Sequence, residues 1–289
     1  MIHGHAGAQV ATRIRSCFRQ NFDLAVNDVI WNMPTDNTGS AFNIPDIELD
    51  GVEGTRCAAH WVALAPRHQF FLHKRKVEGK ETKMPHENAV AAVVQHMEAV
   101  RDKHLTCRFN EAASTALKEG QRLTQTPELV PILDSQVKWD SSLQMLDRDW
   151  ILKTSFDQAA LYNRRIPCLR CSPEAYLRSR NIAGVIRPWV HATSILQGDR
   201  VTLSIVLPCL GVLAKRMLVA APLQVLTPAS SHEAVVDEIN EDELDEPSIQ
   251  LRAILREEIQ ANYHHFAKSE PTMQKASAVD PRFRQLFRA

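Results

Sequence analysis

Apolar residues recur at helical spacing through most of this chain, and that spacing limits the folds that are open to it. Residues 88–98 and 107–123 are rich in alanine and carry their charges on one face, which predicts two amphipathic helices that pair antiparallel. Glycine occurs only 10 times and aromatic residues make up 6% of the chain, while Ala, Leu, Gln, Glu and Arg are plentiful. Helix is therefore expected to outweigh strand.

Further helices are predicted by the same spacing. One of them begins at Asp140 or Ser141, either of which can cap it, and runs through Ile151. The others are expected over residues 10–22, 57–65, 182–196, 202–218 and 247–268.

One segment near the start is typical of a strand. Residues 25–33 are rich in β-branched side chains, and Pro34 ends the strand that they predict. Asp36 then follows at the carboxyl end of this strand, where α/β sheets tend to place ligands. Residues 45–54 are polar and acidic and are expected to form a loop or a poorly formed strand.

The charges of the chain are balanced, with 34 basic and 34 acidic residues. A free-standing DNA-binding module usually carries a basic excess, so the bulk charge argues against one. Local basic patches remain at residues 73–76 and around Arg164 and Arg165. Acidic residues crowd into residues 231–246, and such self-repelling runs predict a solvated linker or a disordered loop.

The chain is expected to stay inside the cell. No apolar stretch follows a basic start, so no signal peptide is predicted. The longest uncharged run, residues 201–214, is shorter than the roughly 20 residues that cross a bilayer, and it predicts a buried helix. Six cysteines in such a chain indicate reduced thiols. Cys168 and Cys171 have the spacing of a metal knuckle, but no second pair follows at the required distance.

Five segments resemble, in the same order, motifs of the hAT superfamily of DNA transposases and of host proteins derived from them. Residues 28–37 end in Thr-Asp-Asn like the family strand T-D-N, and residues 56–65 resemble the family's C-x-x-H with its following helix. Residues 137–146 are similar to T-R-W-N-S-T-x-x-M-L. Residues 186–208 resemble P-F-x-x-A-T-x-x-L-S-G with S-x-V-L-P, and residues 278–284 resemble L-D-P-R-F-K.

This resemblance implies a mainly α protein with a small α/β part, a partial ribonuclease H-like fold that carries a large all-helical insertion. The ribonuclease H-like segment is expected at residues 1–66 and the helical insertion at 67–230. The acidic linker or disordered loop occupies 231–246, and a C-terminal helix at 247–289 returns toward the first part. The resemblance also implies a nuclear location.

Strand cleavage and transfer need two divalent ions, held by several carboxylates. The resemblance implies three: an Asp on a first strand, the Asp of T-D-N, and a Glu far downstream. Asp36 matches the second, whereas the first is expected upstream of Met1 and the third beyond the D-P-R-F segment. Asp36 is thus either a vestigial metal ligand or a turn-forming residue. We expect no catalysis and no cofactor, with Mg²⁺ or Mn²⁺ required if any activity remains.

Candidate DNA contacts are Trp139, Lys138, Arg164 and Arg165. Trp139 resembles the family tryptophan that stacks on a flipped base, and its alternative role is a core residue at a helix start. Lys138 stands where the family has Arg, which loses a bidentate grip on phosphate.

Cys57 and His60 lie three residues apart, and this pair is structural unless partners from elsewhere complete a metal site.

Three functions follow as alternatives. The first is a catalytically inactive, transposase-derived fragment with residual DNA or protein binding. The second is a host-adopted nuclear protein that binds DNA and regulates. The third is a helical interaction scaffold unrelated to DNA, whose acidic run recruits basic partners. The expected partners are DNA and further copies of the chain in a homo-oligomer, as in the family, with neither a membrane nor a small-molecule substrate.

Overall fold

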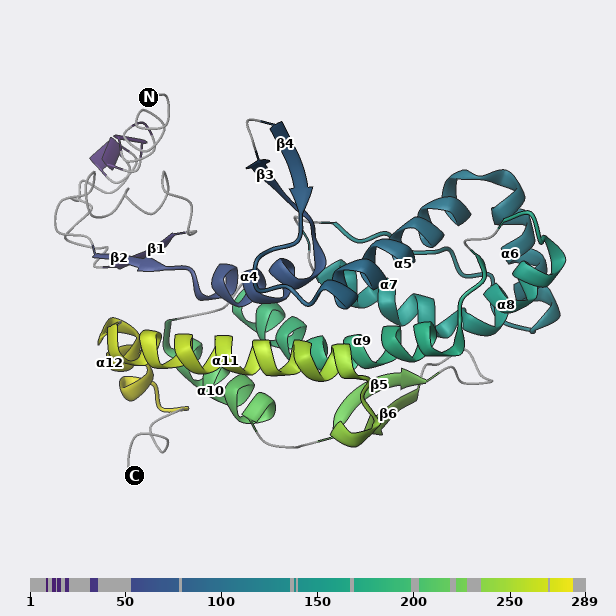
Figure 1. The fold of residues 1–289 in the computed structure, drawn as a ribbon. Coiled ribbons are helices and arrows are strands. Elements are labelled where there is room, and N and C mark those ends of the chain that lie inside the picture. The colour runs from purple at the N-terminus through teal and green to yellow at the C-terminus, as the bar shows by residue number, and fades with distance from the viewer. Residues whose placement is uncertain are drawn as a thin grey trace. The chain divides into compact units, whose positions relative to one another are not determined.

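The computed structural model describes residues 9, 12–13, 15–16, 19–20, 32–35, 53–77, 80–135, 138, 140–166, 169–198, 203–218, 222–227, 235–269 and 271–282. The chain is mostly helical, as its composition predicts (Figure 1). It divides into two compact units. The first combines residues 1–62, 193–210 and 263–289, and the second combines residues 63–192 and 211–262.

The first unit contains a parallel pair of strands, β1 (Asn32–Thr35) and β2 (Glu53–Arg56), in which Asn32 lies opposite Glu53. A parallel pair needs a crossover connection of a dozen or more residues, which residues 36–52 supply. Strand β1 includes the last two residues of the predicted strand, and the rest of that prediction lies outside the described residues. Strand β2 begins within the segment that was expected to be a loop or a poor strand. Helix α4 (Ala58–Phe70) follows it directly, five residues longer than predicted.

Four helices make up much of the second unit: α5 (Ala91–Phe109), α6 (Glu111–Leu123), α7 (Asp140–Ile151) and α8 (Lys153–Tyr162). Asn110 separates α5 from α6, because its backbone N–H donates to the Thr106 carbonyl and closes α5. Its side chain accepts a hydrogen bond of 3.0 Å from the Ala113 N–H and caps α6. Both of the predicted Ala-rich helices are therefore present, joined through a single residue.

Helices α6 and α8 touch along their backbones at Gly120. A Cβ atom at this position would collide with the backbone carbonyl oxygen of Ser155 and would lie 3.0 Å from the Ala159 nitrogen. The Thr124 hydroxyl also lies 2.9 Å from the Ser155 hydroxyl. Glycine at position 120 thus permits an approach that any other residue would block.

Two long helices follow, α9 (Pro173–Leu196) and α10 (Leu203–Leu218). Helix α9 begins nine residues before the predicted start. Pro173 occupies its first turn, where a missing N–H costs no hydrogen bond, and the Ser172 hydroxyl accepts from the Ala175 N–H at 3.2 Å. Both helices continue through an internal proline, Pro188 in α9 and Pro208 in α10.

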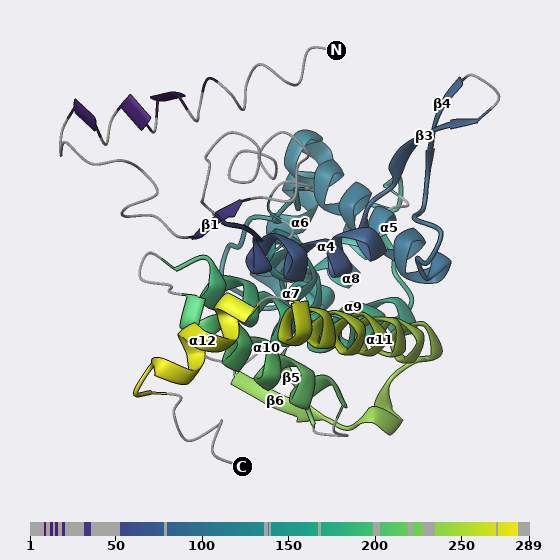
Figure 2. The same cartoon turned by 90° about the vertical axis from the view of Figure 1, so that its left-hand side faces the viewer.

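The region 67–230 is not all-helical, which corrects the expected helical insertion. Strands β3 (His73–Val77) and β4 (Lys80–Met84) form an antiparallel hairpin that extends away from the helices of its unit in both views (Figures 1 and 2). Strand β5 (Leu223–Thr227) pairs antiparallel with β6 (Val235–Ile239). Each hairpin is only five residues deep, so neither gives a long periodic signal in the sequence.

The acidic run is also structured where the structure describes it, against the expected linker or disordered loop at residues 231–246. Strand β6 is followed by a 3₁₀ turn, η3 (Glu241–Glu243), and by α11 (Glu246–Ser269) and α12 (Pro271–Val279). Neighbouring groups of opposite charge or hydrogen-bonding capacity hold the acids. Glu241 lies 2.9 Å from Arg256, and Asp245 lies 2.7 Å from Arg178.

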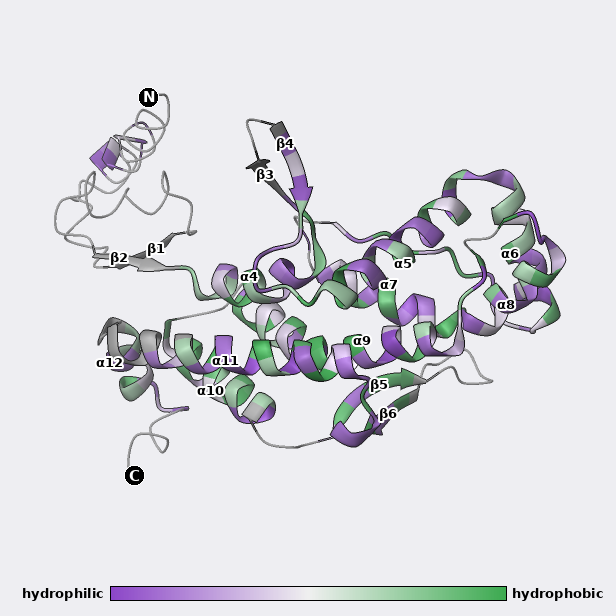
Figure 3. Ribbon diagram, in the orientation of Figure 1, coloured by the Kyte–Doolittle hydropathy of each residue, from purple (hydrophilic) through white to green (hydrophobic). Residues whose placement is uncertain are grey.

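Along most helices, hydrophobic and hydrophilic residues alternate in the manner of amphipathic segments (Figure 3). In the second unit their apolar faces meet in a core that includes Trp150, Leu152, Phe156, Leu169 and Tyr176. The charged residues discussed below lie either inside this unit or in an open cavity at its surface.

Candidate functional site

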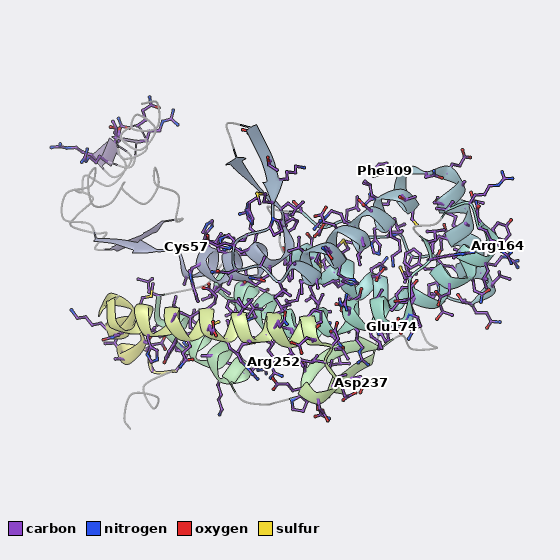
Figure 4. The ribbon with its side chains drawn as sticks, viewed as in Figure 1. Cys57, Phe109, Arg164, Glu174, Asp237 and Arg252 are labelled. Atoms are coloured by element: carbon purple, nitrogen blue, oxygen red, sulfur yellow. The ribbon has the colours of Figure 1, made fainter. Side chains whose placement is uncertain are left out.

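The residues that the sequence singled out are only partly described. Asp36 and Trp139 lie outside the described residues, as does Cys168. Lys138 is exposed, and so are Arg164 and Arg165 in the turn that follows α8; Figure 4 labels Arg164 there. Their predicted contacts with DNA therefore remain predictions.

Cys57 and His60 lie at the start of α4, both of them half-buried. Cys57 immediately precedes the helix, and its carbonyl oxygen accepts the hydrogen bond of the Trp61 N–H at 3.1 Å. Within the described part of the chain, no group of three or more His, Cys, Asp or Glu side chains is arranged to hold a metal ion.

Two of the resembling segments meet in the first unit. The Ser204 hydroxyl donates a hydrogen bond of 2.6 Å to Asp280 Oδ2, and the Ser277 hydroxyl donates to the Ser204 carbonyl oxygen at 2.8 Å. Arg282 lies 2.6 Å from the same carboxylate. Hydrogen bonds from Arg282 and Ser204 hold the pKa of Asp280 well below its usual range. Asp280 therefore connects the start of α10 to the segment after α12, which are far apart in the sequence.

A third segment contributes to an ion pair in the second unit. Asp134 accepts two hydrogen bonds from the Arg101 guanidinium, at 2.6 and 2.7 Å, and one of 3.0 Å from the Ser142 hydroxyl. Arg101 also lies over the Phe71 ring, 4.9 Å from its centroid. Such a bidentate, three-point contact fixes the loop before α7 onto α5.

A buried charge network joins α5, α7 and α9. Lys103 Nζ lies 2.5 Å from Asp149 Oδ1, and each side chain is only 1% exposed. The Ser179 hydroxyl donates to Asp149 Oδ2 at 2.7 Å and lies 2.8 Å from His96 Nε2. Since that hydroxyl has a single hydrogen, His96 must donate to it through Nε2–H. His104 Nε2 lies 3.4 Å from Asp149 Oδ1.

Opposite charges keep this network ionised despite its burial. Burial alone would raise the pKa of Asp149, but Lys103 and His104 outweigh it and lower that pKa. Burial would lower the pKa of Lys103, and Asp149 and Cys171 raise it. The Lys103 ammonium also lies 4.6 Å from the centroid of the Phe156 ring. Because the network is sealed from solvent, its role is to bind three helices together.

The sequence held a signal for this network that the motif analysis missed. Lys103 recurs at helical spacing with Met97, Val100 and Cys107, all of them buried on α5. Asp149 has the same relation to Met145 and Leu146 on α7. A charged residue in an apolar stripe indicates a buried partner of opposite charge, because an isolated buried charge is too costly.

Three histidines also come together from α4, β3 and the turn after β4. The His68 and His86 rings stack with their centroids 4.2 Å apart, and the His73 ring lies edge-on, 5.4 Å from His68. Burial, followed by the neighbouring histidines, lowers the pKa of His68 to about 4. Stacked neutral rings are therefore favoured over charged ones.

One cavity of the second unit gathers basic side chains that are open to solvent. It has a volume of about 270 Å³ and is lined by Arg187 and His191 from α9, Arg216 from α10, and Gln224 and Glu238 from the β5–β6 hairpin. His191, Arg216 and Glu238 are exposed. This is the best candidate for a binding site in the described residues, and sequence spacing could not predict it because its residues come from separate segments.

No helix in the described ranges is both long and apolar enough to cross a membrane. Comparisons of the chain with protein-family models, with curated proteins and with solved structures find no significant match.

Proposed function

We propose that this chain is a protein of hAT-transposase descent that binds DNA in the nucleus without cutting it. The observation that carries the proposal is the hydrogen bond of 2.6 Å between Ser204 and Asp280. Ser204 belongs to the segment that resembles S-x-V-L-P, and Asp280 to the segment that resembles D-P-R-F. Two motifs that were recognised independently in the sequence thus share one hydrogen-bonded cluster, as expected if they descend together from one fold.

The parallel strands also support this descent. Strand β1 (Asn32–Thr35) ends within the T-D-N segment, β2 (Glu53–Arg56) leads into the C-x-x-H segment, and α4 follows. A parallel pair followed by a helix is the kind of unit from which the expected α/β part would be built. The ribonuclease H-like sheet itself belongs to the proposal.

Binding without cleavage rests on the carboxylates. Only Asp36 matches one of the three metal ligands that the resemblance implies, and two ions cannot be anchored by one side chain. Glu241 and Asp245 from the acidic run are engaged with arginines, so they do not supply the missing ligands.

The structure weakens the alternative of a scaffold whose acidic run recruits basic partners. Within η3, the Glu243 carboxylate accepts the Asn240 N–H at 2.9 Å. Glu241 and Asp245 pair with arginines of the same unit. An acidic surface that is partly neutralised from within attracts cationic partners less strongly.

The test is DNA binding and cleavage by the whole chain. Fluorescence anisotropy with a labelled duplex should give an affinity that falls steeply as salt rises, because phosphate contacts release counterions. Incubation of the duplex with Mg²⁺ or Mn²⁺ should produce no nicks. The proposal fails if no salt-dependent binding occurs, or if metal-dependent cleavage occurs that Asp36→Ala abolishes.

A further inference from the structure

The cavity between α9, α10 and the β5–β6 hairpin has the features of a built anion site. Its position follows from Gly184 on α9. A Cβ at Gly184 would lie 3.0 Å from Val225 Cγ1 and 3.4 Å from Leu223 Cβ, so glycine lets the hairpin pack closely against the helix. That contact brings the carbonyl oxygen of Gln224 to the side chain of Arg187, one helical turn further along α9.

Arg187 is held in a fixed orientation at the back of the cavity. Its Nε–H donates to the Gln224 carbonyl oxygen at 2.9 Å, and its Nη2 donates to Asp147 Oδ1 at 2.7 Å. The Arg187 and Asp147 side chains are 14% and 13% exposed. The guanidinium is a rigid fork of five N–H donors, and Nη1 makes no hydrogen bond to any residue that the structure describes. A positioned donor of this kind suits a phosphate oxygen.

Two further basic side chains line the same cavity. His191 lies one turn after Arg187 on α9, and Arg216 lies near the end of α10. Both are exposed, and neither side chain has an ion pair or hydrogen bond within the described ranges. Their capacity for donating hydrogen bonds is thus open to a ligand.

The acidic groups around the cavity limit what can bind. Asp147 lies behind Arg187 and is already paired with it. Glu238 lies opposite Gln224 across the hairpin register and lines the cavity with it. Asp237, labelled in Figure 4, precedes it on the alternate face of β6 and does not line the cavity. Three basic side chains thus face one unpaired carboxylate, which favours a single anionic group.

The volume narrows the choice further. About 270 Å³ is at or below the low end of the roughly 300–1,000 Å³ that small-molecule pockets span. A phosphate with its attached sugar carbons is a better match for this space than a whole nucleotide cofactor.

We propose that the Arg187–His191–Arg216 cavity binds a phosphate group, and that this phosphate belongs to the backbone of DNA. The second part rests on the proposed function, and the first part does not. Arg187 would supply the oriented donor, while Arg216 and His191 would close on the outer phosphate oxygens. Glu238 would weaken the contact, since a carboxylate repels the phosphate.

The experiment uses variants of exposed residues in the whole chain, because Arg187 also holds the hairpin and its replacement could disturb folding. Anisotropy with a labelled duplex is measured for Arg216→Ala, Arg216→Lys, His191→Ala and Glu238→Gln. Arg164→Ala serves as the matched control, an exposed arginine outside the cavity. A second series measures inorganic phosphate by the chemical-shift changes that it causes.

Loss of Arg216 should lower duplex affinity by about tenfold and reduce the salt slope by about one, the change expected for one lost phosphate contact. Arg216→Lys should restore part of this affinity, because it keeps the charge but loses the fork. Glu238→Gln should raise duplex affinity by a few-fold. A ligand that carries its own positive group would instead bind more weakly to Glu238→Gln, and that result would overturn the proposal.

The two series separate this inference from the proposed function. Normal duplex binding by all four cavity variants overturns the inference and leaves the proposed function standing. Phosphate binding that depends on Arg216, without any duplex binding, supports the anion site and overturns the proposed function. If the natural chain binds neither duplex nor phosphate, both are wrong.

Discussion

The second unit holds two clusters of charged residues that differ in their access to solvent. The Lys103–Asp149 pair is 1% exposed on both sides, and hydrogen bonds from Ser179 complete it. The cavity around Arg187 and Arg216 contains the same kinds of groups but opens to water. The first cluster is closed within the protein, whereas the second has donors left to offer.

This difference separates charges that hold the fold from charges that can bind a ligand. A buried pair is costly to form, and it is costlier still to break, because one charge then remains in a medium of low polarity. An open cluster is solvated whether or not a ligand is present, so its residues can change with little effect on folding. Stability and binding measurements should therefore respond to different residues.

The largest effect is expected from Asp149→Asn. The change leaves the Lys103 ammonium buried without a counter-charge, and we expect a loss of about 3–5 kcal/mol in the free energy of unfolding. Urea unfolding followed by circular dichroism measures this loss. The double variant Lys103→Met with Asp149→Leu should recover most of the stability, while Arg216→Ala should leave the unfolding midpoint unchanged. A small loss for Asp149→Asn would show that the network is not a structural element.

The next effect is a loss of stability in acid that originates at His96. Burial lowers the pKa of His96 from 6.5 to about 4. Between these two values the unfolded chain binds the proton and the folded chain does not, so stability falls as the pH drops from 6.5 toward 4. This residue can account for at most about 3 kcal/mol, since one pKa unit corresponds to 1.36 kcal/mol.

Unfolding midpoints across this pH range test that assignment. His96→Gln should flatten part of the acid dependence, and the remainder should include His68, whose pKa is also lowered to about 4. His191→Gln, at an exposed histidine of the open cavity, is the control and should leave the profile as it is. An unchanged slope in His96→Gln would contradict the assignment.

Helices were predictable here because their signal repeats over many residues. The prediction for residues 202–218 misses the start of α10 by a single residue, and Asp140 begins α7 as expected. The hairpin β5–β6 gave no such signal, because each strand is five residues long and its register is defined only by its partner. The acidic run misled for the same reason, since Arg178, Arg252 and Arg256, which lie outside it in sequence, offset its charge.

The candidate site was less predictable than the fold. Arg187 and His191 lie within a segment that the resemblance had already marked, but Arg216 and Glu238 joined them only through folding. Spacing along one helix can bring residues 187 and 191 to one face, yet it cannot place a hairpin beside them. The buried Lys103, in contrast, sits in an apolar stripe that the sequence alone displays.

An intermediate effect is expected from Asp147→Asn, which lies between the two clusters in burial. Asp147 is 13% exposed and pairs with Arg187 at 2.7 Å. Its loss removes one charge-assisted hydrogen bond but leaves Arg187 bound to the Gln224 carbonyl oxygen, so we expect a loss of about 1.5 kcal/mol. Urea midpoints compared directly with those of Asp149→Asn provide the measurement. Equal losses in the two variants would remove the distinction between closed and open clusters.

The smallest effect is expected at Glu119, on the solvent side of α6. Its carboxylate lies 2.5 Å from Arg122, an arginine that is 69% exposed. Water already solvates both groups, and ordering two long side chains offsets most of their attraction, so Glu119→Gln should not shift the urea midpoint measurably. Raising the salt concentration should likewise change little. If Glu119→Gln destabilised the protein as much as Asp147→Asn does, burial would not be what decides the strength of an ion pair here.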